Sequence, residues 1–224
     1  MAVYDFHTHT FLSDGVLSPV ELIRRAAVRD YTAIAVTDHA ALGTLERIIR
    51  ELTVECALAQ DRWGIIALPG VELTHVPVSA IGEAAQRAKG LGARLVIVHG
   101  ETVVEPVEPG TNLAAVQCPY VDILAHPGLL TVQVAALAAQ NNVLIEVSAR
   151  RGHSLANGHV VRTARQEGAI MVVDSDAHAP EDLLTAEYAR MVARGAGLDE
   201  GELEGVLSIN PQALLRRLGA ETSG

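Results

Sequence analysis

The chain has 224 residues, of which 49% are hydrophobic and only 3% aromatic, so it can bury one large core made mainly of Ala, Val, Leu and Ile. Its net charge of −10 argues against a broad binding surface for long nucleic acids, because such a surface needs clustered positive charge. No apolar run has the length of a membrane span, and the chain opens without a signal-peptide pattern. We therefore expect a cytoplasmic protein that contacts neither membranes nor long nucleic acids.

Short apolar strands and helices alternate along the chain. The first helix is predicted from Ser18, an N-cap residue that Pro19 and Glu21 follow. Further helical patterns span Ile81–Leu91, Thr131–Ala139, Gly158–Gln166 and Pro180–Arg194. Seven stretches read as parallel strands buried on both faces: Ala2–Phe6, Ala33–Thr37, Ile65–Leu73, Arg94–His99, Val121–Ala125, Val143–Val147 and Ala169–Val173. This alternation predicts a parallel sheet, either a barrel or an open doubly wound sheet.

The end of the chain reads as helical. A last amphipathic helix is predicted over Gln212–Leu218, and we expect it to pack on the outside, with residues 221–224 frayed. We expect a single domain over 1–224, with a barrel over roughly 1–195 and C-terminal helices over 199–218. Cys56 and Cys118 lack the spacing of metal ligands and are expected to be buried thiols.

Six of the seven predicted strands end in a His, Asp or Glu side chain. One isolated histidine is more often a hydrogen-bonded core residue than a ligand, but so many at one structural level predict a metal site. The carboxyl ends of the strands are also where (β/α) barrels build their active sites. The residues at these ends are His7 and His9, Asp38 and His39, Glu72, His99, His126, and the run from Asp174 to His178.

These strand ends resemble the PHP family, the polymerase and histidinol phosphatase superfamily. Its lone strand-end ligands are matched by His99 and His126, and the closer likeness is to stand-alone histidinol-phosphatase-like proteins. The resemblance implies a distorted (β/α)7 barrel with metal-dependent phosphoester hydrolysis as its activity, and it does not establish the substrate. Its four motifs are matched by Asp5-Phe6-His7-Thr8-His9-Thr10, Thr37-Asp38-His39, Gly70-Val71-Glu72 and Asp174-Ser175-Asp176-Ala177-His178.

The resemblance implies three metal ions. The implied ligands are His7, His9, Glu72 and Asp176 at a first position, the bridging Glu72 with His99 and His126 at a second, and Asp14, His39 and His178 at a third. Imidazole and carboxylate donors without thiolate suit Zn, Mn or Fe, and the sequence does not choose among these metals. Asp14 has an alternative interpretation, because Asp14-Gly15 is also a plausible turn.

Further polar residues lie in the same strand-end loops. Arg150 and Arg151 follow the sixth strand, where a guanidinium can bind a phosphate dianion, although either can be a solvated surface residue. Asp38 adjoins the implied ligand His39, where its carboxylate can orient an imidazole, and Asp174 is similarly placed and is expected to support a ligand or to bond to the backbone. The side chains that are candidates for contact with the substrate, or for supporting the ligands, are His75, Glu101, His153, Asn157 and His159.

The reaction implied by the resemblance is hydrolysis of a small-molecule phosphate monoester, histidinol phosphate or another phosphometabolite, by a hydroxide that bridges the first two metals. Glu72 and Asp176, together with Arg150 and Arg151, are then the catalytic residues. One alternative is a phosphodiesterase or exonuclease that acts on short nucleotides or cyclic phosphates. Another is a module that binds metal for stability without catalysis. The oligomeric state is left open.

Overall fold

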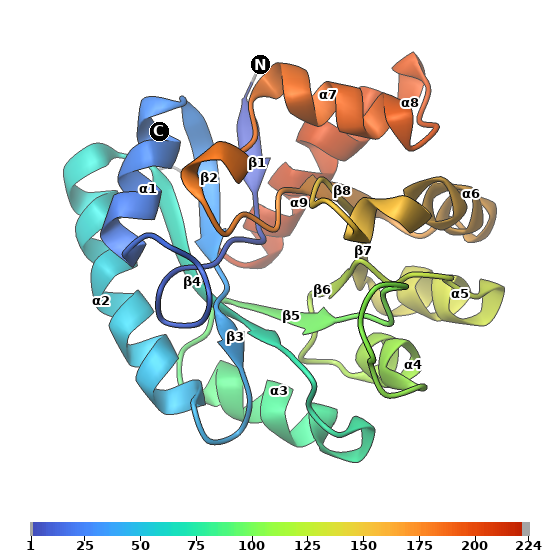
Figure 1. Ribbon diagram of the computed structural model, residues 1–224, viewed down its shortest axis with the longest axis horizontal. Helices are drawn as coiled ribbons and strands as arrows, with labels where there is room; N and C mark the ends of the chain where they lie inside the picture. Colours follow the sequence, from blue (N-terminus) through green and yellow to red (C-terminus); the bar gives the residue numbers. More distant parts are fainter. Residues whose placement is uncertain (1, 221–224) are drawn as a thin grey trace.

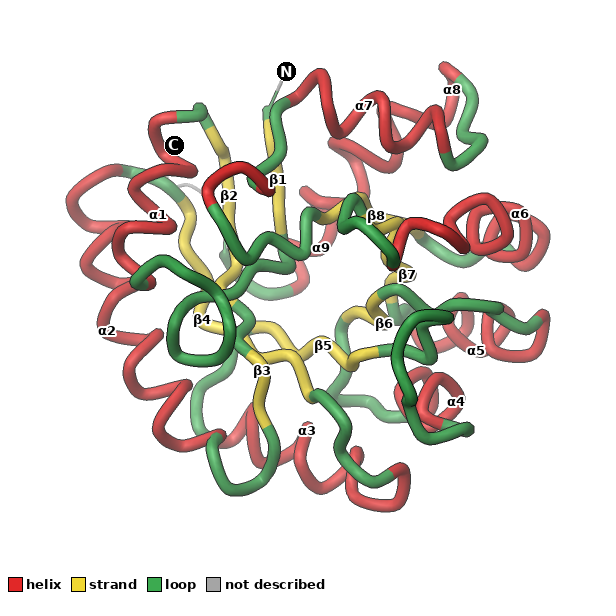
Figure 2. The backbone as a smooth tube through the Cα atoms, in the orientation of Figure 1, coloured by secondary structure: helices red, strands yellow, loops and turns green. Residues whose placement is uncertain are grey.

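The protein, a computed structural model that describes residues 2–220, is built from strands that surround a central axis and helices that surround the strands (Figure 1). The strands are β1 (Val3–Asp5), β2 (Tyr31–Val36), β3 (His39–Ala40), β4 (Ile66–Leu73), β5 (Leu95–His99), β6 (Ile123–Ala125), β7 (Leu144–Ser148) and β8 (Met171–Asp174). The helices are α1 (Pro19–Val28), α2 (Leu45–Trp63), α3 (Ile81–Gly90), α4 (Thr111–Gln117), α5 (Val132–Asn141), α6 (Asn157–Glu167), α7 (Ala186–Gly195), α8 (Glu200–Glu204) and α9 (Asn210–Arg217). Loops connect each strand to the next helix around the ring (Figure 2).

The strands form one parallel, nearly closed barrel. Their order is β1-β2-β4-β5-β6-β7-β8, with the short β3 paired to the carboxyl end of β4, where His39 lies opposite Glu72. Each of the seven predicted strands is present, and β3 is the addition. The expected distorted (β/α)7 barrel is therefore confirmed, and the open sheet is excluded.

The barrel closes between β1 and β8 largely through side chains. One isolated parallel bridge joins Thr8 to Ala177 across this seam. The carboxylate of Asp174 accepts a hydrogen bond from the Phe6 backbone N–H at 2.6 Å, and the carboxylate of Asp5 accepts one from the Ser175 N–H at 3.0 Å. Asp174 thus bonds to the backbone, one of its two expected roles, and helps to close the ring.

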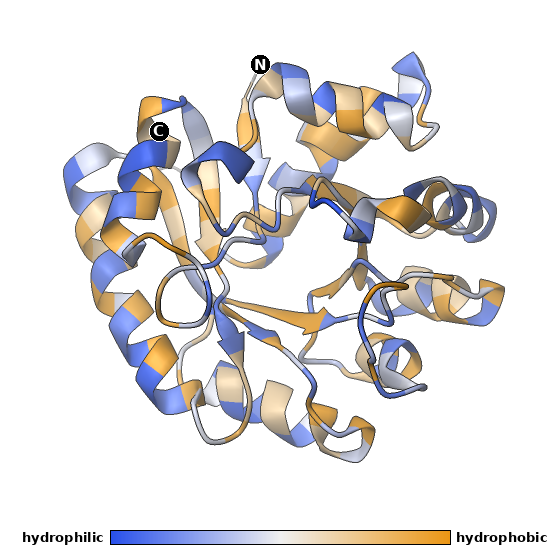
Figure 3. Ribbon diagram, in the orientation of Figure 1, coloured by the Kyte–Doolittle hydropathy of each residue, from blue (hydrophilic) through white to orange (hydrophobic). Residues whose placement is uncertain are grey.

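Apolar side chains form two cores, one on each side of the strands. The larger core lies between the strands and the surrounding helices, several of which carry both hydrophobic and hydrophilic stretches in Figure 3. The smaller core fills the barrel interior with residues such as Phe6 and Ile97, and the buried Leu214 and Leu215 of α9 belong to it. The prediction that the last helix packs on the outside is therefore wrong, because α9 contributes to the inner core.

The helices differ from the predictions in three places. Helices α2 and α4 were not predicted; the Thr44 hydroxyl does not cap α2, and Gly110, at the N-cap of α4, has no side chain that could signal a helix start. The predicted helix Pro180–Arg194 is instead a short 3₁₀ helix, Pro180–Asp182, followed by α7. Thr185 starts α7 because its hydroxyl accepts a hydrogen bond from the Tyr188 N–H at 3.0 Å.

Three further expectations concern membrane spans, the two cysteines and the end of the chain. Within residues 2–220, no helix combines the length and apolar character needed to cross a membrane. Cys56 and Cys118 are free and buried, as expected. The predicted fraying of residues 221–224 lies outside the described part of the chain.

Candidate metal centre

The carboxyl ends of the strands bring the predicted ligands together in a buried group. His7, His9 and Glu72 are completely buried, and His99, His126 and Asp176 are each 2% exposed. His126 and Asp176 adopt left-handed backbone conformations, with φ of 26° and 52°, which are costly for residues other than glycine. Such conformations persist where the surrounding structure holds them, and both residues here point into the group of predicted ligands.

The four ligands expected at the first position face one another. Nε2 of His7 lies 3.4 Å from Glu72 Oε1, and Nε2 of His9 lies 3.2 Å from Asp176 Oδ1. All four of these atoms are buried without a hydrogen-bond partner. Unsatisfied buried polar atoms are costly, and a cation among imidazole nitrogens and carboxylate oxygens would satisfy them together. The residues present therefore fit a metal ion.

Glu146, on β7, is a residue of this site that the sequence analysis missed. Its carboxylate lies 2.6 Å from Nδ1 of His7 and accepts that hydrogen bond, which leaves Nε2 of His7 free to bind a metal. Although burial alone lowers the pKa of His7, the charges of Glu146, Glu72 and Asp176 outweigh it and hold that pKa well above its usual value. The available signal was a single charged residue within an otherwise apolar strand.

The second position gains a ligand candidate in the structure. Ligand atoms of His99, His126 and His153 lie within 4.8 Å of one another, and His126 Nε2 lies 3.4 Å from Glu72 Oε1. Burial, together with neighbouring positive rings, lowers the pKa of His153 to about 3, so this ring is neutral and able to bind a cation. His153, expected to touch the substrate or support ligands, thus lies among the ligand candidates themselves.

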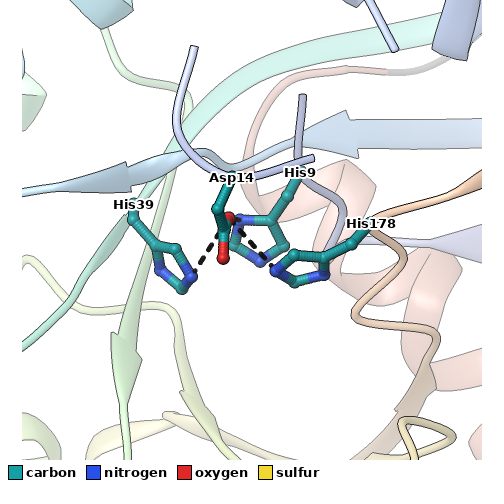
Figure 4. Close-up of side chains that lie close together, drawn as sticks. All are labelled: His9, Asp14, His39 and His178. Atoms are coloured by element: carbon teal, nitrogen blue, oxygen red, sulfur yellow. Dashed lines mark ion pairs between the residues drawn. The ribbon is translucent and has the colours of Figure 1, made fainter. Parts of the chain in front are cut away.

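The third position is the most open of the three. Oδ1 of Asp14 lies 3.2 Å from His178 Nε2 and 3.5 Å from His39 Nε2, and His9 adjoins the same group (Figure 4). The Asp14 side chain is 53% exposed. Despite its partial burial, hydrogen bonds and charge from His178 and His39 hold the pKa of Asp14 below its usual range. Asp14 therefore faces ligand candidates from β3 and from the loop after β8.

Only one of the two candidate arginines reaches the group. Nη1 of Arg150 donates to the backbone oxygen of Asp176 at 3.1 Å and lies 2.6 Å from His178 Nδ1. Its Nε lies 3.6 Å from the Asp176 carboxylate. Arg151, the next residue, is exposed. The structure thus places Arg150, and not Arg151, beside the predicted ligands.

Three of the remaining candidates support loops, and none of the side-chain hydrogen bonds found for them among the described residues reaches the side chain of a predicted ligand. Asp38 was expected to orient an imidazole, but its carboxylate accepts hydrogen bonds from Thr10 and Ser13 and so holds the loop that carries Asp14. Asn157 donates to the Ser148 carbonyl at 2.8 Å, and Nε2 of His159 lies 2.8 Å from the Leu130 carbonyl.

The loop between β5 and α4 holds the candidate Glu101 and a second missed residue, Glu105, which faces the candidate His75 from the segment after β4. Glu101 bonds to the backbone at the start of α4. His75 Nε2 lies 3.6 Å from Glu105, which the sequence analysis did not select. Glu105 also faces His99 and His153. The sequence of this loop has no periodic pattern that predicts these contacts of Glu105, so only the folded loop reveals them.

Comparison with known proteins places the chain in a family. The model of the PHP domain family matches residues 5–85, which contain His7, His9, Asp14, His39 and Glu72. An uncharacterized protein of Methanocaldococcus jannaschii is 47% identical over 216 residues, which cover 96% of this chain and 99% of the relative. The chain belongs to the PHP family. The family predicted from the strand-end motifs is thereby confirmed.

Two more distant matches extend this comparison. A probable phosphatase of Thermoanaerobacter is 27% identical over 216 residues, covering 88% of each chain. The crystal structure of histidinol phosphate phosphatase from Lactococcus lactis, complexed with Zn, L-histidinol and phosphate, superposes with a TM-score of 0.59. That match has 14% identity and covers 88% of this chain and 94% of the other, so it shows a shared barrel fold.

Proposed function

We propose that this PHP protein hydrolyses phosphate monoesters of small molecules with three metal ions at the mouth of its barrel. At the level of reaction class it is a metal-dependent phosphoesterase, in keeping with its family and with its phosphatase relative. The finer parts of the proposal are the substrate class, the number of ions and the roles of individual residues. Each of these is supported by a feature of the site.

The observation that carries the proposal is the convergence of buried, unpartnered donor atoms. His7 Nε2, both ring nitrogens of His9, Glu72 Oε1 and Asp176 Oδ1 have no hydrogen-bond partner in the buried group. Bound cations would act as Lewis acids, stabilising the charge of a phosphoryl transition state and lowering the pKa of water. A site that served stability alone would more simply be filled by apolar side chains.

The grouping of the ligand candidates supports the proposed number of ions. Glu72 has one oxygen near His7 and His126 and the other near His9 and His39, which suits a carboxylate shared between neighbouring ions. Asp14, His39 and His178 supply a separate set. Three ions of Zn, Mn or Fe suit these imidazole and carboxylate donors, because both free thiols lie in the outer core, away from the donor set.

The chain's own positive group for a phosphate is Arg150. Its guanidinium is partly exposed, at 31%, and lies against Asp176 and His178 at the edge of the ligand group. A guanidinium so placed can donate two hydrogen bonds to a phosphate dianion that enters from solvent. The overall charge of −10 favours a small substrate over a long nucleic acid, which would meet repulsion around the site.

A comparison of esters tests this proposal. Protein loaded in turn with Mn, Zn and Fe is assayed on p-nitrophenyl phosphate, on its bis ester and on a panel of phosphorylated metabolites that includes histidinol phosphate. The proposal predicts faster turnover of monoesters than of the diester. Preference for the diester would instead favour a phosphodiesterase or exonuclease, and no turnover at full metal occupancy would favour a binding module.

A further inference from the structure

We propose that Glu105 is an additional ligand of the metal at the second position, delivered by the loop between β5 and α4 (Figure 1). This inference rests on the metal centre of the proposed function. It adds a residue that lies outside the strand-end motifs and six positions beyond the end of β5. The support comes from four features of this loop and of the rings beneath it.

The Glu105 carboxylate faces two of the three rings at the second position, those of His99 and His153. One oxygen, Oε2, lies 3.2 Å from His99 Nε2, and the other, Oε1, lies 3.5 Å from His153 Nε2. Both rings belong to the same candidate group as His126. A cation bound by these two nitrogens would therefore lie next to a carboxylate oxygen.

The two rings present the correct nitrogens for coordination. Nδ1 of His99 donates to the Gly100 carbonyl at 3.2 Å, and Nδ1 of His153 lies 2.7 Å from the Thr102 hydroxyl, which can accept its hydrogen. With Nδ1 occupied in this way, the lone pair of each neutral ring is on Nε2. Those are the two atoms that face Glu105, so the three groups converge from different elements.

Charge balance also favours a carboxylate here. The predicted ligands of the second position are neutral imidazoles and Glu72, which also serves the first position. A divalent ion in this environment keeps an uncompensated positive charge, and a buried charge is stable only when it is paired. Glu105 supplies a negative charge that the second position does not share with the others.

The loop is held at its base, which lets it present Glu105 in a defined place. The carboxylate of Glu101 accepts hydrogen bonds from the backbone N–H groups of Gly110 and Asn112 at 3.0 and 2.9 Å. In return, the Asn112 side chain accepts one from the Glu101 N–H at 2.9 Å. Val103 and Val104, at the tip, are 49% and 48% exposed. The tip thus lies at the surface, on a base that hydrogen bonds hold in place.

The chain offers a matched control in the same loop. Glu108 is a carboxylate three residues further on, and its Oε2 accepts a hydrogen bond from the Val78 N–H at 3.0 Å. No ion pair between Glu108 and a ring of the second position is found among the described residues. Glu108→Gln therefore changes the charge of the loop equally without touching the proposed ligand.

Metal binding tests the inference without relying on activity. Metal-free wild type, Glu105→Gln and Glu108→Gln are equilibrated in zinc-buffered solutions, and bound zinc is counted by elemental analysis. Glu105→Gln should need at least about tenfold more free zinc to bind one of its ions, with the others unchanged, and Glu108→Gln should follow the wild type. Circular dichroism confirms that each variant is folded, and Glu105→Asp, which keeps the charge, should recover part of the affinity.

Two results would overturn the inference. One is a Glu105→Gln isotherm that matches the wild type, even if its activity falls, since Glu105 would then act on the substrate. The other is an equal shift in Glu108→Gln, which would indicate a general effect of loop charge. A protein that binds zinc through Glu105 yet hydrolyses no phosphate monoester would support this inference and contradict the proposed function, so the two failures are distinguishable.

Discussion

The carboxylate of Glu146 lies 2.6 Å from Nδ1 of His7, and both side chains are completely buried. Glu146 points into the barrel from the middle of β7, below the strand ends that carry the predicted ligands. The contact fixes which nitrogen of His7 is free, and it adds a negative charge beneath the first metal position. The candidate metal centre thus extends one layer deeper than the strand ends.

Glu146→Gln should weaken metal binding at the first position by about ten- to a hundredfold, because such supporting carboxylates orient and polarise a ligating imidazole. The measurement is competition with a chromophoric chelator. Activity should return at high metal concentration. Glu21→Gln, which removes an exposed carboxylate paired with Arg25 on α1, is the control and should leave the affinity unchanged. Equal metal affinities for Glu146→Gln and the wild type would show that Glu146 does not support metal binding.

Arg150→Ala should raise KM for phosphate monoesters by roughly ten- to a hundredfold, because a charge-assisted hydrogen bond contributes about 1.5–3 kcal/mol. Bound metal should stay constant by elemental analysis. Arg151→Ala is the matched control, since its side chain is exposed on the neighbouring residue, and its KM should be close to that of the wild type. If Arg151→Ala has the larger effect, the phosphate contact is assigned to the wrong arginine.

Metal affinity should rise with pH. In the metal-free chain, burial opposes protonation of His39, but Glu72 and Asp14 outweigh it and raise the pKa of that ring to about 10. His39 is then protonated at pH 7 and must lose its proton to bind a metal, so competition from protons weakens as the pH rises toward 10. His9 and His153, each with a pKa lowered to about 3, release no proton.

Calorimetry in buffers of different ionisation enthalpy measures the protons released as zinc binds. The wild type should release protons at pH 7, and His39→Asn should release fewer. Zinc binding without proton release, or an affinity that is constant between pH 6 and 9, would contradict the predicted protonation of the metal-free rings.

Much of the fold and many of the candidate ligands could be predicted because strand and ligand signals are local. Each buried strand is a short apolar run, and the polar residue that ends it is adjacent in sequence, as at His99 and His126. The barrel and the PHP family followed from those ends and are confirmed. The metal roles of the strand-end residues stay predictions, although the structure brings these side chains together.

The remaining features depend on contacts that have no local signal. An amphipathic pattern does not reveal that Leu214 and Leu215 enter the inner core, because the interior exists only once all the strands have assembled. His153 and Glu105 approach His99 from different segments of the chain, so their proximity depends on loop conformation. Asp38 adjoins His39 in sequence, yet its carboxylate bonds to Thr10 and Ser13.

Leu214→Ala should lower the free energy of unfolding by about 2–5 kcal/mol, as expected when a buried leucine of a filled core is truncated. Leu214 is 2% exposed and packs in the barrel interior. Leu58→Ala, on the outward side of α2 and 47% exposed, should change stability by about 0.5 kcal/mol or less. Urea unfolding measures both. Similar losses for the two variants would mean that α9 does not close the inner core.

The most direct test of the metal-dependent monoesterase is a titration of the metal-free protein with Mn. Phosphate release from p-nitrophenyl phosphate is followed against the number of ions bound per chain. The account predicts no turnover without metal, an increase with occupancy, and a plateau when three ions are bound. Full occupancy without phosphate release, or full activity in the metal-free protein, would contradict it.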